Sequence, residues 1–146
     1  MLLFKKKFIE QIKQGEKTQT IRLWQYRRMK PGQRSYVPGV GYIAITSVEP
    51  VKLAQLTDDD AKLDGFPTAD MLRKELRSLY EADVLEKMTP FRIRFSVYPP
   101  REQKKIAKEQ QRKKQEQKQL NTSDAKQQDY VDHTLDKLLK MLLMPD

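Results

Sequence analysis

The residues of this sequence that could do chemistry gather near the N-terminus, in Gly15-Glu16-Lys17-Thr18-Gln19-Thr20-Ile21-Arg22. A threonine hydroxyl such as that of Thr20 is a weak nucleophile and needs a neighbouring base. Lys17 can serve as that base if burial and a nearby cation such as Arg22 lower its pKa. Arg22 can alternatively hold a carbonyl or phosphate oxygen in its planar fork. The stretch therefore predicts either amide cleavage or anion binding.

Asp64 is the carboxylate that could take or return a proton during amide cleavage. The alternative is a purely structural role near the start of a helix, together with the aspartates at 58–60, because carboxylates favour that end of the helix dipole. These aspartates lack the glycine and the ligand spacing of a calcium loop, so we expect no metal site and no cofactor. The absence of cysteine and the single histidine argue against a zinc site and a histidine-based triad.

The elements that must position these residues begin with a helix. Phe4, Phe8, Ile9 and Ile12 have helical spacing, and Gly15 stands where a C-cap glycine would. In a regular strand Thr18, Thr20 and Arg22 would share one face, with Lys17 on the other. Lys17 can therefore join Thr20 only if the chain is still turning after Gly15.

The rest of the first hundred residues predicts short elements of mixed type. We expect a type II turn at 30–33, helices capped by Thr57 and Thr68, and a buried stripe of Leu72, Leu76 and Leu79 in the second of these helices. The strands are expected at 18–24, 34–37, 42–48 and 91–97. Without regular βαβ alternation, this order favours the α+β class, as a small antiparallel barrel with helices packed at its ends.

The stretch from Gly15 to Arg22 has the spacing Gly-x-Lys-x-x-x-x-Arg between a helix and a strand, and it resembles the ASCH domain family. The likeness covers residues 1–98 and continues in Lys30-Pro31-Gly32-Gln33, in residues 45–53, in Leu56-Thr57 and in residues 91–95. The resemblance implies a PUA-like fold, which is a small β-barrel with flanking short helices.

The resemblance also implies a function. Members of the ASCH family are thought to bind RNA, and a small bacterial branch hydrolyses the amide of N4-acetylcytidine. The catalytic lysine, threonine and glutamate of that branch correspond here to Lys17, Thr20 and Asp64, so the third position departs from the family by one methylene. We therefore expect an RNA- or modified-nucleoside-binding protein, with an N4-acetylcytidine amidohydrolase as the alternative.

Residues beside the motif could extend the predicted binding surface. Aromatic rings and cations can stack a base and hold phosphate. The alternative is a core tryptophan beside a solvated basic turn. The expected binding residues are Gly15, Thr18, Arg22, Trp24, Tyr26, Arg27 and Arg28.

The charge of the chain is strongly uneven, and it divides the sequence into three parts. The net charge is +9, made up of +6 in residues 1–100, +5 in residues 101–120 and −2 in residues 121–146. We expect an ASCH/PUA-like domain at 1–98 and a charged spacer at 99–123, with a break at 121–124. The spacer is either a solvated helix or disordered, and its cations could neutralise RNA phosphates.

The last part, 124–146, predicts an amphipathic helix, with Asp129 as its N-cap and Pro145 as its stop. Its apolar stripe consists of Val131, Leu135, Leu138 and Leu142, widened by Leu139. This stripe could dock on the parent domain, self-associate or enter a groove of a protein partner. The last possibility would make the chain an adaptor.

No apolar run in the sequence approaches the 18 residues of a membrane span, and Leu2-Leu3-Phe4 is too short for the apolar region of a signal peptide. We therefore expect a soluble, basic, cytoplasmic protein that has no membrane partner.

Overall fold

The computed structural model describes residues 1–143, so Pro145 lies outside the described residues. The chain forms two compact units, residues 1–103 and the residues from Lys104 on.

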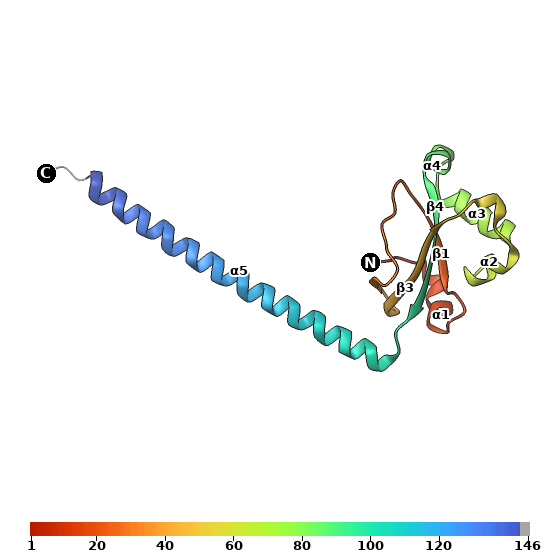
Figure 1. Ribbon diagram of the computed structural model, residues 1–146, viewed down its shortest axis with the longest axis horizontal. Coiled ribbons are helices and arrows are strands. Elements are labelled where there is room, and N and C mark those ends of the chain that lie inside the picture. The colour runs from red at the N-terminus through yellow and green to blue at the C-terminus, as the bar shows by residue number, and fades with distance from the viewer. Residues whose placement is uncertain (144–146) are drawn as a thin grey trace. The chain divides into compact units, whose positions relative to one another are not determined.

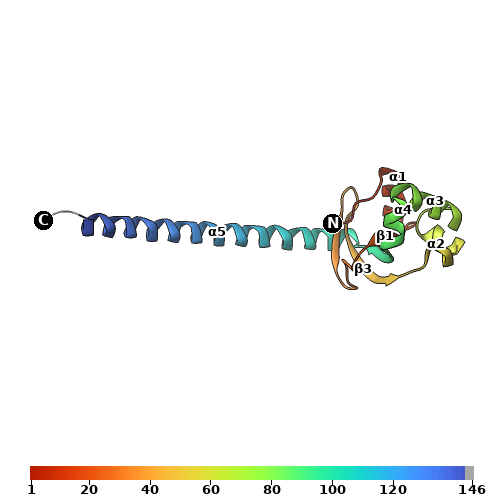
Figure 2. The same cartoon turned by 90° about the horizontal axis from the view of Figure 1, so that it is seen from above.

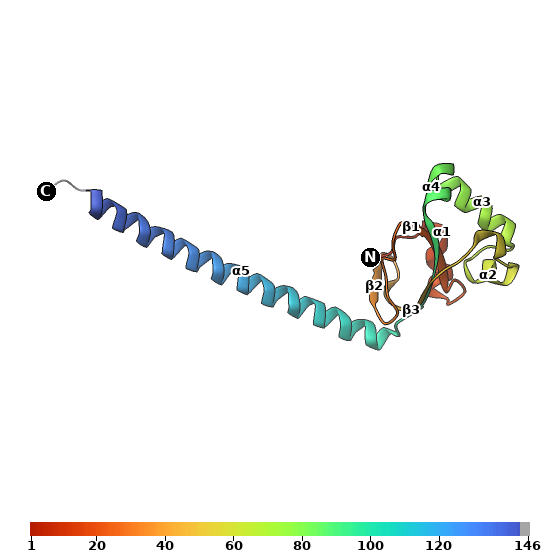
Figure 3. The same cartoon turned by 45° about the horizontal axis from the view of Figure 1, so that its top comes forward.

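The first unit is built on a four-stranded antiparallel sheet in the order β1-β4-β3-β2. The strands are β1 (Gln19–Trp24), β2 (Arg34–Val37), β3 (Gly41–Pro50) and β4 (Thr89–Val97). A register shift between Ile45 and Ser47 interrupts the pairing of β3 with β4, as a β-bulge does where a strand bends. The sheet curves as half a barrel (Figures 1 and 3), which confirms the predicted α+β class.

Short helices complete this unit: α1 (Lys6–Lys13), α2 (Asp58–Leu63), α3 (Ala69–Leu79) and α4 (Ala82–Lys87), with a 3-10 turn at Leu53–Gln55. Both predicted caps are confirmed. Thr57 and Asp60 form a capping box at α2, and the Thr68 hydroxyl accepts a hydrogen bond from the Met71 amide at α3. Helix α4 is not among the elements that the sequence pattern predicts.

Buried side chains form two apolar clusters. The first joins α1 to the sheet and includes Phe8, Ile12, Trp24, Ile43 and Ile93. The second joins β1 to α2 and α3 and includes Ile21, Leu23, Ala61, Leu72 and Leu76. The prediction for Leu79 was wrong, because this last residue of α3 is 52% exposed and lines a pocket instead of the core.

The second unit continues helix α5, which runs from Pro100 to Leu143 without interruption (Figure 2). The break expected at 121–124 is absent, because the polar side chains there bond within the helix. Thr122 Oγ1 donates to the Lys118 carbonyl at 2.8 Å, and Gln117 Nε2 donates to Asn121 Oδ1 at 3.0 Å. Asp129 accordingly lies inside the helix and is not an N-cap.

The predicted apolar stripe lies on the surface of this unit. Val131, Leu135, Leu138, Leu139 and Leu142 are each between 42% and 80% exposed. Among residues 1–143, no helix has both the length and the apolar character needed to span a membrane.

Candidate functional site

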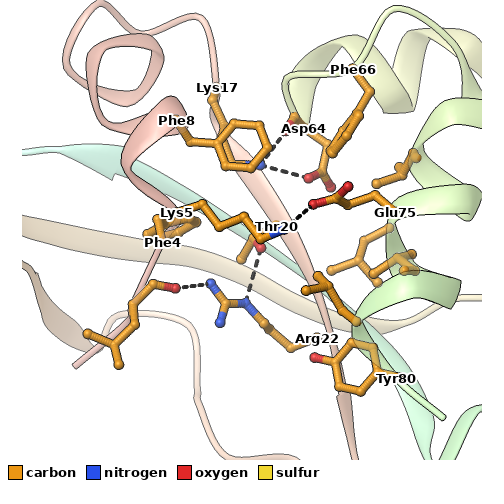
Figure 4. Close-up of a pocket in the computed structure, with 15 residues that line it drawn as sticks. Phe4, Lys5, Phe8, Lys17, Thr20, Arg22, Asp64, Phe66, Glu75 and Tyr80 are labelled. Atoms are coloured by element: carbon orange, nitrogen blue, oxygen red, sulfur yellow. Dashed lines mark hydrogen bonds and ion pairs between the residues drawn. The ribbon is translucent and has the colours of Figure 1, made fainter.

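A pocket of about 310 Å³ opens between the segment leading into α1, strand β1 and helix α3 (Figure 4). Its walls are largely apolar and include the rings of Phe4, Phe8, Phe66 and Tyr80. Its polar residues include Lys17, Thr20, Arg22 and Asp64. The structure therefore brings together the three residues of the predicted catalytic set and Arg22.

The turn after α1 decides where Lys17 points. Gly15 has φ +77°, and the amides of Glu16 and Lys17 both donate to the Gln11 carbonyl, at 2.9 and 3.1 Å. The chain is thus still turning at Lys17, and β1 begins only at Gln19. Lys17 is free of the alternation of the strand and can lie in the same pocket as Thr20.

Lys17 and Asp64 form a buried ion pair. Lys17 Nζ lies 2.7 Å from Asp64 Oδ1 and also donates to the Asp64 backbone carbonyl, and the two side chains are only 2% and 4% exposed. Gln19 Nε2 donates to the other carboxylate oxygen of Asp64 at 3.5 Å. Asp64 is the C-cap of α2, and the Thr18 amide bonds the neighbouring Leu63 carbonyl at 2.9 Å, which ties this end of the helix to the start of β1.

Burial moves both groups of this pair toward their neutral forms. It lowers the pKa of Lys17, and the cations Arg22 and Lys7 act in the same direction, whereas Asp64 opposes them. Burial raises the pKa of Asp64, against the attraction of Lys17. A lysine with a lowered pKa is available as a base nearer neutral pH.

Arg22 holds the hydroxyl of Thr20. Arg22 Nε donates to Thr20 Oγ1 at 3.2 Å, and Nη2 donates to the Leu3 carbonyl at 2.6 Å. The guanidinium carbon lies 5.0 Å from the centre of the Phe4 ring. Because the Thr20 oxygen accepts from Arg22, its own proton is available to a second acceptor.

A second ion pair in this pocket was not foreseen. Lys5 Nζ lies 2.7 Å from Glu75 Oε1 (Figure 4). Lys7 Nζ lies 3.6 Å from the same oxygen. The pair joins the residue before α1 to α3, and both of its side chains line the pocket.

The other predicted binding residues do not line this pocket. Gly15 and Thr18 line a separate depression beside the end of α1. Trp24 is 9% exposed and packs on Phe91 with ring centres 5.7 Å apart, so it belongs to the core. Tyr26 is 74% exposed, and Arg27 and Arg28 are exposed as well.

The sequence pattern did not indicate Phe66, Glu75 and Tyr80, which line the pocket, or Gln19, which donates a hydrogen bond to Asp64. Phe66 and Glu75 lie far along the chain from the motif, and no local pattern links them to it. Gln19 stands inside the motif, where its place between Lys17 and Thr20 was the available signal.

The aspartates at 58–60 have structural partners. Asp58 Oδ1 accepts from the Ala69 amide at 2.8 Å, and Asp60 lies 2.9 Å from Arg92 Nη1. In the described part of the chain, no three histidine, cysteine or acidic side chains cluster as metal ligands would.

Comparisons with known proteins bear on the fold. No family model and no curated protein matches the sequence. Among solved structures, the hypothetical protein PH0355 is 19% identical with a TM-score of 0.58, and the match covers 66% of this chain and 95% of that one.

Two bacterial structures match as well. The ASCH domain from Lactobacillus crispatus JV V101 is 20% identical with a TM-score of 0.53, covering 61% of this chain and 69% of that one. Protein EF3133 from Enterococcus faecalis V583 is 19% identical with a TM-score of 0.50, covering 62% and 69%. The chain therefore has the PUA-like fold of an ASCH domain, as the motif from Gly15 to Arg22 predicts.

Proposed function

We propose that this chain is an ASCH-family protein whose pocket binds a modified nucleoside, either free or as an unstacked base of RNA. The observation that carries the proposal is the set of buried polar groups of Lys17, Thr20 and Asp64, with the partly buried Arg22 beside them, in a pocket with aromatic walls. A cavity of about 310 Å³ is at the lower end of the range for ligand sites, which suits one base and its substituent.

The chemistry of the lining supports a base as the ligand. The rings of Phe4, Phe8 and Phe66 offer surfaces on which a base can stack. Lys17, Thr20 and Arg22 offer hydrogen-bond donors, and the carboxylate of Asp64 offers acceptors. Buried polar groups of this kind discriminate against ligands that leave them unpaired.

Amide hydrolysis of N4-acetylcytidine is a second candidate, favoured by the hydrogen bond from Arg22 to the Thr20 oxygen. Thr20 Oγ1 would attack the acetyl carbonyl while Lys17, as the neutral amine, takes the hydroxyl proton. The C–N bond then breaks, and the proton passes to N4 of the leaving cytidine. Water hydrolyses the threonine ester and releases acetate. Asp64, although shorter than glutamate, still reaches Lys17.

One experiment tests both candidates. The protein is titrated with N4-acetylcytidine by calorimetry, and the same samples are then chromatographed for cytidine and acetate. Thr20→Val removes the hydroxyl at nearly constant shape, and Thr18→Val is the matched control because Thr18 does not line this pocket. We expect binding that weakens roughly tenfold in Thr20→Val, since a buried hydrogen bond is lost, and is unchanged in Thr18→Val.

The products separate the candidates. Cytidine and acetate formed by the parent protein and lost in Thr20→Val would establish the hydrolase. Binding without product would leave the nucleoside-binding function alone. If folded protein binds neither N4-acetylcytidine nor cytidine, the assignment of the pocket to these nucleosides is wrong.

A further inference from the structure

Helix α5 carries an ordered arrangement of cations on one side. Arg101, Lys104, Lys105, Lys108 and Arg112 follow the spacing i, i+3, i+4, i+7, i+11, which puts five cations along one face of a helix. All five side chains are exposed. At about 1.5 Å of rise per residue, the row is about 16 Å long.

The acidic residues of the same segment stand to one side of this row. Glu102, Glu109 and Glu116 recur every seven residues and so follow a line of their own along the helix. Arg112 Nε lies 3.7 Å from Glu116 Oε1, and both side chains are well exposed, so water and salt screen this pair and its disruption costs little. The three glutamates thus lie beside the row of cations and not within it.

We propose that this face of α5, defined by Arg101, Lys104, Lys105, Lys108 and Arg112, binds the phosphate backbone of a nucleic-acid duplex. A duplex carries one negative charge per about 1.7 Å of its axis with both strands counted, so a stretch as long as the row contains roughly ten phosphates, part of which face the row. Arg101 and Arg112 stand at the two ends of the row. The planar guanidinium group of each can donate paired hydrogen bonds to phosphate oxygens. Gln115 and Gln119 continue the row and offer amide donors.

The composition of the segment sets nucleic acid apart from a membrane surface. A helix that lies on a membrane needs bulky apolar side chains opposite its cations. Residues 101–119 contain only Ile106 and Ala107 as apolar residues, and Ile106 is buried. The segment therefore offers charge without the apolar area that would hold it in lipid.

The test uses the full chain and a fluorescent RNA duplex, with a DNA duplex of the same sequence as the second arm. Lys104, Lys105 and Lys108 are changed together to Gln in one variant. The matched control changes Lys113, Lys114 and Lys118 to Gln, which removes the same charge from the same helix but from outside the row. Glutamine and lysine have similar helix propensities, and circular dichroism checks that the helix is retained.

We expect the row variant to bind at least roughly tenfold more weakly at low salt and its log–log salt slope to fall by about 3. Between 50 and 200 mM salt its affinity should therefore change about 40-fold less than that of the parent. The control should lose less than about threefold. Equal binding of both duplexes would show that the row recognises the phosphate backbone of either nucleic acid. Tighter binding of the RNA duplex would identify RNA as the preferred ligand.

Equal losses in the two variants would overturn the proposal, because total charge and not the row would then govern binding. Affinity for phosphatidylserine vesicles without affinity for either duplex would overturn it as well. The variant that changes Lys104, Lys105 and Lys108 should bind N4-acetylcytidine as the parent does, because none of these residues lines the pocket. A failure here is therefore distinguishable from a failure of the pocket assignment.

Discussion

Two lysine–carboxylate pairs line the same pocket with the same separation between nitrogen and oxygen, 2.7 Å, but in opposite surroundings. The side chains of Lys17 and Asp64 are 2% and 4% exposed, whereas those of Lys5 and Glu75 are 50% and 21% exposed. Burial pushes the pKa of Asp64 up, whereas the hydrogen bond from Lys5 pulls the pKa of Glu75 down. Burial, and not distance, therefore decides what an ion pair does to its members.

The largest expected effect is on the buried pair. Asp64→Ala leaves Lys17 buried without its carboxylate, so we expect the free energy of unfolding to fall by about 3–5 kcal/mol in urea denaturation at neutral pH. The control is the double variant Lys17→Met with Asp64→Leu, which replaces the pair by apolar side chains and should lie within about 1 kcal/mol of the parent or above it. A loss below about 1 kcal/mol in Asp64→Ala would remove the contrast between the two pairs.

The two ion pairs should change the pH dependence of the free energy of unfolding in opposite directions. The pKa of Asp64 is raised above its ordinary 3.8 in the folded state, so the native protein holds this proton more tightly. The stability that this group contributes is present below pH 3.8 and is lost as the pH rises through the folded pKa.

Glu75 behaves in the opposite way, because its pKa is lowered below its ordinary 4.5. Its contribution is present above pH 4.5 and is lost as the pH falls through the folded pKa. Stability is measured from pH 3 to 7 for the parent, Asp64→Asn and Glu75→Gln. The advantage of the parent should decrease with rising pH over Asp64→Asn and increase over Glu75→Gln, and slopes of one sign would contradict the assigned pKa directions.

The smallest expected effect is at the exposed pair. Lys5→Gln should lower the free energy of unfolding by less than about 1 kcal/mol, because solvent screens the interaction with Glu75. Salt at about 1 M should reduce the difference in the free energy of unfolding between Lys5→Gln and the parent, since the Debye length is then about 3 Å. Lys6→Gln, next along the chain, is the matched control. A loss as large as that of Asp64→Ala would show that the exposed pair holds the fold as firmly as the buried one.

The contrast also explains which parts of the site could be predicted. The sequence analysis named Lys17, Thr20, Arg22 and Asp64, and the structure places all four in one pocket. It assigned no role in the site to Glu75, which lies 70 positions from Lys5, because nothing in the local pattern says which helix faces the N-terminal segment.

Local physics accounts for the predictions that the structure confirms. Thr57 and Asp60 cap α2 because they stand three residues apart, and Gly32 takes φ +86° in the turn at 30–33 because a glycine adopts that conformation without strain. Apolar and polar residues alternate at 91–97, which predicts a strand, and Phe91, Ile93 and Phe95 are indeed buried. In each case the deciding atoms lie within a few residues of one another.

Tertiary packing decided the remainder. Lys17 and Asp64 are 47 positions apart, and their burial, which sets the pKa of each, exists only once α2 lies against the start of β1. Packing also buries Trp24 in the core, although its position beside the motif predicts a binding role. It leaves Leu79 at the pocket, although its helical spacing predicts a core residue. A sequence pattern fixes which side chains share a face, but the surface that covers that face, and hence its dielectric and its partners, comes from distant residues.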